Sequence, residues 1–103
     1  MAKSIVLHKV KDKDINLTIT AYIKNMAQLD IEYYDIGGPY GDYERHLTLT
    51  TDATQKLCQM YNCNIHNLLE KVKDFFSGDG CNRNFQEFCD KNDLKYDTFV
   101  WND

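Results

Sequence analysis

The segment 15–23 alternates between apolar and more polar side chains with a period of two. Its odd positions are all apolar: Ile15, Leu17, Ile19, Ala21 and Ile23. Because successive side chains of a strand point to opposite faces, five apolar odd positions predict a strand with one buried face. Such a strand needs partner strands beside it and a second layer over its apolar face.

The first half of the chain contains three more strand-like segments, separated by turn signals. Polar residues occupy 11–14, and glycines with a proline occupy 37–41, where they favour turns over a continuing ladder. Short links between neighbouring strands predict an antiparallel meander. The four expected strands cover 5–10, 15–23, 29–34 and 43–50, with Asn25 and Met26 as the turn between the second and the third.

After residue 50 the apolar period becomes that of a helix. Apolar residues recur at spacings of three and four over 53–61, 65–76 and 85–89, and 94–101 closes the chain as a strand. Thr51 or Asp52 is placed to cap the first helix, and Asn64 to cap the second. The fold class is therefore α+β, a two-layer sandwich in one domain over 1–103. Its antiparallel sheet is a four-strand meander plus a C-terminal strand, and about three helices pack on one face.

The charge balance excludes one class of function. The chain has 12 Lys and Arg against 16 Asp and Glu, a net charge of −4 at pH 7. A protein that binds nucleic acid by neutralising phosphates needs a basic face, so direct nucleic-acid binding is not expected. Acidic residues dominate 25–50, whereas lysines dominate 1–24. A basic protein partner suits this acidic segment better.

Composition also indicates a cytoplasmic protein with no membrane partner. No stretch approaches the ~18 consecutive apolar residues of a transmembrane helix. The N-terminus runs into a strand pattern without the apolar core of a secretory signal. Four cysteines are present, and Cys58 and Cys89 fall within apolar helical patterns. Free thiols in a reducing compartment are therefore expected.

Three kinds of reactive site can be weighed against these patterns. Cys58, Cys63 and His66 fall within nine residues, but the paired C-x2-C knuckles of structural zinc are missing. Cysteine and histidine combinations suit a nucleophile, yet nothing in the spacing fixes their geometry. Glu44 and His46 share a strand face and could act as an acid–base or metal pair, although a solvated surface pair is the simpler interpretation. No catalytic residue, metal or cofactor is therefore predicted.

Acidic side chains and tyrosines are interleaved over residues 30–45. Tyrosine supplies contact area with little entropy to lose, and acidic neighbours would steer a basic partner. An open sheet that is merely solubilised by acids has the same composition, so both interpretations stay open here. The residues predicted to bind a partner are Asp30, Glu32, Tyr34, Tyr40, Asp42, Glu44 and His46.

Several segments resemble a group of small bacterial proteins. The resemblance covers roughly residues 40–102 and is carried by 41–49, by the helix end 72–78 and by the closing segments 85–89, 94–96 and Trp101. The group has an acidic strand of the form Asp-Tyr-Glu-aromatic, whereas this chain has Arg45 where an aromatic residue is commoner. In size and acidity the chain is also similar to the immunity proteins of bacterial toxin systems, which occlude a toxin with an acidic surface.

These patterns lead to one expected function and several alternatives. The chain is expected to be a non-enzymatic binding protein of immunity or inhibitor type, which covers a basic partner such as a toxin. One alternative is a phage-encoded inhibitor of a host defence complex, acting as an acidic mimic of nucleic acid. A small enzyme that uses Glu44 and His46 is another alternative, and a homodimer formed through the sheet face or an exposed edge strand is a further possibility.

Overall fold

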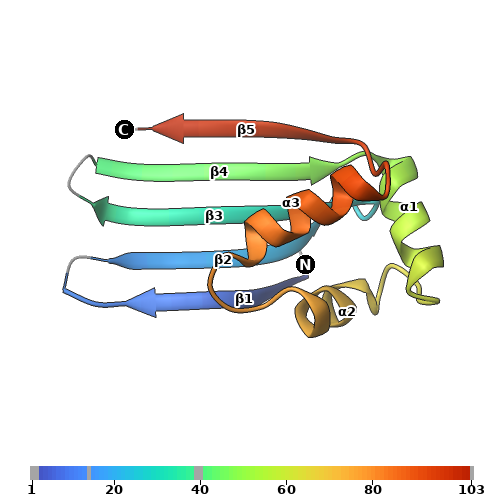
Figure 1. The fold of residues 1–103 in the computed structure, drawn as a ribbon, viewed down its shortest axis with the longest axis horizontal. Coiled ribbons are helices and arrows are strands. Elements are labelled where there is room, and N and C mark those ends of the chain that lie inside the picture. Colours follow the sequence, from blue (N-terminus) through green and yellow to red (C-terminus); the bar gives the residue numbers. More distant parts are fainter. Residues whose placement is uncertain (1–2, 14, 39–40, 103) are drawn as a thin grey trace.

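A computed structural model describes residues 3–13, 15–38 and 41–102 and contains one five-stranded sheet with three helices (Figure 1). The strands lie in chain order, β1-β2-β3-β4-β5, and every neighbouring pair is antiparallel. None of the described helices has the length and apolar character needed to cross a membrane. The strands are β1 (Ser4–Lys11), β2 (Asn16–Lys24), β3 (Gln28–Gly38), β4 (Gly41–Leu49) and β5 (Tyr96–Asn102), and the helices are α1 (Thr51–Met60), α2 (Leu68–Phe75) and α3 (Cys81–Lys91).

The predicted α+β class, with a four-strand meander and a C-terminal strand, is confirmed. The predicted turn at Asn25 and Met26 is also present. Both residues have positive φ, 52° and 59°, and the N–H of Ala27 donates to the carbonyl of Lys24 at 3.0 Å. These features define a tight β-turn, in the three-residue connection between Lys24 and Gln28.

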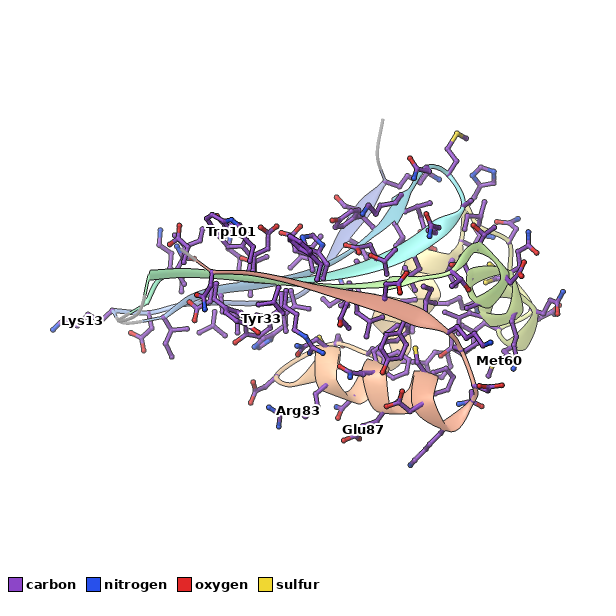
Figure 2. The ribbon with its side chains drawn as sticks, turned by 90° about the horizontal axis from the view of Figure 1, so that it is seen from above. Lys13, Tyr33, Met60, Arg83, Glu87 and Trp101 are labelled. Carbon is purple, nitrogen blue, oxygen red and sulfur yellow. The ribbon has the colours of Figure 1, made fainter. Side chains whose placement is uncertain are left out.

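All three helices lie on one side of the sheet, toward one of its ends (Figures 1 and 2). The apolar odd positions of β2 point to this side, where they meet their partners on β3 across the ladder. Ile19, Ala21 and Ile31 are almost fully buried, and α1, α2 and α3 each contribute one buried face above them. The opposite face of the sheet carries no helix (Figure 2).

The junction between β4 and α1 is held by two threonines. The Thr50 hydroxyl accepts a hydrogen bond from the N–H of Ala53 at 3.1 Å, which caps the helix. The hydroxyl of Thr54 donates to the carbonyl of Thr50 and accepts from the N–H of Leu29. The bond from Ala53 to Thr50 satisfies a backbone N–H of the first helical turn that has no partner within the helix. The bond from Leu29 to Thr54 joins α1 to β3.

Replacing Thr50 with alanine should lower the free energy of unfolding by about 1 kcal/mol, because the Ala53 N–H loses its cap. Urea denaturation followed by circular dichroism measures this change. Thr51→Ala is the matched control, since Thr51 is an exposed helical residue for which a change below about 0.5 kcal/mol is expected. Equal losses in the two variants would contradict the capping role.

The starts of all three helices differ from the sequence expectation. The predicted cap of the first helix, Thr51 or Asp52, is wrong, because Thr50 caps it and Thr51 is already its first helical residue. The predicted helix 65–76 begins only at Leu68, because the Asn64 side chain accepts from the N–H groups of His66 and Asn67 and forms a local turn instead. The third helix begins at Cys81 rather than near Phe85, directly after Gly80 with φ of 75°. The left-handed backbone conformation at this position favours glycine. The first turn of the helix is mostly polar, so the spacing of apolar residues predicted a later start.

Candidate functional site

The sheet face opposite the helices, called here the open face, gathers the acidic side chains of β3 and β4. Glu32 lies opposite His46 in the ladder, Asp30 opposite Thr48, and Tyr34 opposite Glu44. Strand residues directly opposite each other point to the same face, so the set shares one surface. Five predicted binding residues are therefore brought together here: Asp30, Glu32, Tyr34, Glu44 and His46.

His46 stands at the centre of this set. Its Nδ1–H donates to Oδ2 of Asp30 at 2.8 Å, and its Nε2–H donates to Oε1 of Glu44, also at 2.8 Å. Oε2 of Glu32 lies 4.0 Å from the same Nε2. In the part of the chain that the structure describes, every ion pair involves this imidazole. His46 and these three carboxylates, Asp30, Glu32 and Glu44, are called the His46 cluster below.

Asp30 differs from the other two acids because it is fully buried. One of its carboxylate oxygens accepts from His46 and the other from the hydroxyl of Thr48. The hydroxyl oxygen of Tyr22 lies 3.1 Å from the His46 Nδ1 and covers the pair from β2. Asp30 was expected to contact a partner, but its burial makes it a positioning residue that fixes the orientation of the imidazole.

The electrostatics of the cluster shift three pKa values upward. Burial lowers the pKa of His46, but hydrogen bonds to Asp30 and Glu44 and the nearby negative charges outweigh it, so the net shift is upward. Burial raises the pKa of Glu32 despite the attraction of His46, with the charges of Glu44 and Asp30 adding to the rise. Burial, followed by a hydrogen bond to Asp30, raises the pKa of the Tyr22 hydroxyl. The raised pKa of His46 favours the charged imidazole beside two partly exposed carboxylates.

An aromatic border lines the cluster on the edge strand. Phe99 lies opposite His46 in the β4–β5 ladder and Trp101 lies opposite Glu44. Both are unusually open for large apolar side chains, with 60% and 43% of their surface exposed. Figure 2 shows Trp101 on the side of the sheet away from the helices. The open face therefore combines fixed charge with exposed aromatic area.

Two predicted residues do not join the cluster. The carboxylate of Asp42 accepts a hydrogen bond from the N–H of Gly37 at 2.8 Å and so holds the β3–β4 connection. It acts there as a turn residue. Tyr40 lies outside the described residues.

The other half of the acidic segment faces the helices. Tyr33, Asp35 and Tyr43 line a cavity of about 350 Å³ beside the start of α3, and Tyr33 packs edge-to-face on Tyr43 at 5.9 Å. Arg45 also lines this cavity and donates to Oε1 of Gln86 at 2.7 Å. Arg45 therefore lies on the face opposite His46.

The cysteines lie away from the open face. All four are free thiols, and Cys81 and Cys89 lie on the buried face of α3. Burial raises the pKa of Cys58 to about 11 and that of Cys89 to about 12. A thiol with such a raised pKa is a poor nucleophile near neutral pH.

Four residues of this site were not singled out from the sequence. Tyr22 could have been found, because the alternation of 15–23 places it on the polar face. Thr48 follows in the same way from the alternation of β4. Phe99 and Trp101 could not, because only the register of β5 against β4 shows that they border the cluster.

No family model matches this chain, and neither a curated protein nor a solved structure is similar enough to count as a match.

Proposed function

We propose that this protein is a non-enzymatic binding protein of immunity or inhibitor type, which uses the open face to occlude a basic protein partner in the cytoplasm. The observation that carries the proposal is the imbalance of charge in the His46 cluster. Three carboxylates surround one imidazole, and in the described ranges no lysine or arginine forms an ion pair with them. Cationic side chains of a partner would supply the missing positive charge.

The shape of the face supports a protein rather than a small molecule as the partner. The molecule measures 41 × 29 × 22 Å along its principal axes, and no helix covers this side of the sheet, so the sheet presents a broad surface here (Figure 2). A standard protein interface covers about 800 Å² on each side, which this face can accommodate. Phe99 and Trp101 offer the exposed aromatic area that interface cores favour, with the carboxylates beside them.

The distribution of charge across the face would also orient the partner. Lys9 and Lys11 lie on β1, where they are paired with β2 positions that point to the open face. The acids lie two and three strands away from β1, on β3 and β4. A partner with basic residues facing β3 and β4 and acidic residues facing β1 would dock in one orientation. The reverse orientation would bring like charges together.

The geometry supports the binding function over the enzymatic alternative. Both ring nitrogens of His46 are engaged, Nδ1 by Asp30 and Nε2 by Glu44. While these two hydrogen bonds are in place, neither nitrogen is directed at a substrate proton, as a general base would have to be. The alternative of a nucleic-acid mimic shares the same acidic surface, and the identity of the captured partner distinguishes it from an immunity protein.

The test is affinity capture from the native host with three baits. The wild type is compared with Glu32→Lys/Glu44→Lys and with the control Glu70→Lys/Glu87→Lys, which changes the net charge equally on exposed positions of α2 and α3. We expect one basic protein to be retained by the wild type and the control but lost by the first variant. The activity of the captured basic protein should fall when the wild-type chain is added to it. Equal retention by all three baits, or no capture, would contradict the proposal.

Once the partner is purified, Glu44→Lys should slow its association about tenfold at low ionic strength, because charge near an interface mainly sets the association rate. The difference should shrink as salt is added. Stopped-flow mixing measures both effects. Glu87→Lys is the matched control on α3 and should leave the rate unchanged. A salt-independent effect of Glu44→Lys would point to a local structural change instead.

A further inference from the structure

We propose that Glu32, Glu44 and His46 form a binding site for one divalent transition-metal ion, with Asp30 as the residue that positions the imidazole. The ligand atoms of the three residues, one from each, all lie within 4.8 Å of one another. This separation lets a single cation contact all three after small side-chain movements, since metal–ligand distances are about 2.0–2.2 Å. The site goes beyond the proposed binding function and does not depend on a partner.

The imidazole is oriented as it is in protein metal sites. Histidine ligands usually donate their other ring N–H to a carboxylate or carbonyl, which fixes the ring and raises its basicity. Here Nδ1–H donates to the fully buried Asp30, and Asp30 is itself held by the Thr48 hydroxyl. Nε2 is thereby directed toward Glu44 and Glu32. The buried Asp30 carboxylate, which contacts the Nδ1 side of the ring, is a separate feature from the partly exposed Glu32 and Glu44 on the Nε2 side.

The strand register explains why the three ligands converge. Glu32 and His46 are directly opposite each other on β3 and β4, and Glu44 is two residues from His46 along β4. Residues in these positions are neighbours on the same face of an antiparallel pair. All three side chains are only partly buried, so a cation can reach them from solvent and keep water at its open positions.

The donor set selects the class of cation. One imidazole nitrogen and two carboxylate oxygens suit Mn²⁺, Zn²⁺ or Fe²⁺, and a three-ligand set leaves open positions. Ca²⁺ requires six to eight oxygen ligands, more than this face supplies, and Mg²⁺ also prefers oxygen. On binding, the Nε2 hydrogen that is now shared with Glu44 leaves to solvent, and the Nε2 lone pair takes the metal.

Mn²⁺ is the probe for the test, because thiolates bind it poorly and the four free cysteines will not compete. The purified full chain is stripped with a chelator and titrated with Mn²⁺, while the free-ion electron paramagnetic resonance signal is recorded. We expect about one bound ion per chain, and at least tenfold weaker binding in Glu32→Gln and in Glu44→Gln. Thr48→Val should weaken binding less than either, because Thr48 acts only through Asp30.

Glu87→Gln is the matched control, since it makes the same chemical change on the exposed side of α3 (Figure 2). It should bind Mn²⁺ as the wild type does. No binding at millimolar Mn²⁺, or full binding by the Glu32→Gln/Glu44→Gln variant, would overturn the metal site. Since these measurements contain no partner, such a result would leave the proposed docking function standing, and failure of partner capture would leave the metal site standing.

Discussion

Replacing His46 with leucine should lower the free energy of unfolding by about 3 kcal/mol, because it leaves a buried carboxylate without its cationic partner. Asp30 is fully buried, and the His46 Nδ1–H supplies the charged donor to its Oδ2. Thr48 still donates to the other oxygen, which keeps the expected loss at the lower end of the range for broken buried pairs. Urea denaturation at constant m-value measures the change.

Two further variants make this prediction specific. His66→Leu is the matched control, because His66 is exposed and the same substitution there should change stability by less than about 0.5 kcal/mol. Asp30→Asn in the His46→Leu background removes the stranded charge and should recover about 1–2 kcal/mol. Similar losses for His46→Leu and His66→Leu would show that the buried pair contributes no stability.

The strands could be predicted from the sequence because the apolar alternation and the turn signals agree. The odd positions of 15–23 fix which face is buried, and Leu17, Ile19 and Ala21 are indeed buried. Ile15 continues the same pattern but is 46% exposed, since it lies just before the first residue of β2. Alternation therefore predicts the face of a residue within a strand and says little at the strand ends.

The candidate site was only partly predictable. The sequence placed Glu32, Glu44 and His46 on one face, since their alternation is visible, but it could not show which face the helices cover. It could not separate buried Asp30 from partly exposed Glu32 either, because the two occupy equivalent positions in the pattern. Burial here depends on the neighbouring strands, where Tyr22 and Thr48 cover the Asp30 carboxylate. The alternation within one strand does not show which side chains of the neighbouring strands will cover a given residue.

Replacing Phe85 with alanine should destabilise the protein by about 3–5 kcal/mol, the usual cost of deleting a buried aromatic ring. Phe85 is the largest fully buried side chain and anchors α3 against the sheet. Its ring packs edge-to-face on Phe76 with centroids 5.1 Å apart, and this contact is lost with the ring. Domains of this size have only about 5–15 kcal/mol of stability in total, so thermal and urea denaturation should both detect the change clearly.

Phe75→Ala is the matched control for Phe85→Ala. Phe75 is 63% exposed and stacks on Tyr61 at 4.9 Å, so we expect a loss below about 1 kcal/mol. Equal losses at the two positions would contradict the assignment of the core.

Phe85→Leu, with a smaller cavity, should stay folded and lose about 1–2 kcal/mol. Because Phe85 lies on the helix side of the sheet, the folded leucine variant should bind Mn²⁺ like the wild type. Weakened binding in that variant would mean that the packing of α3 controls the geometry of the His46 cluster through the sheet. Unchanged binding would show that β3 and β4 alone position the cluster, as their ladder indicates.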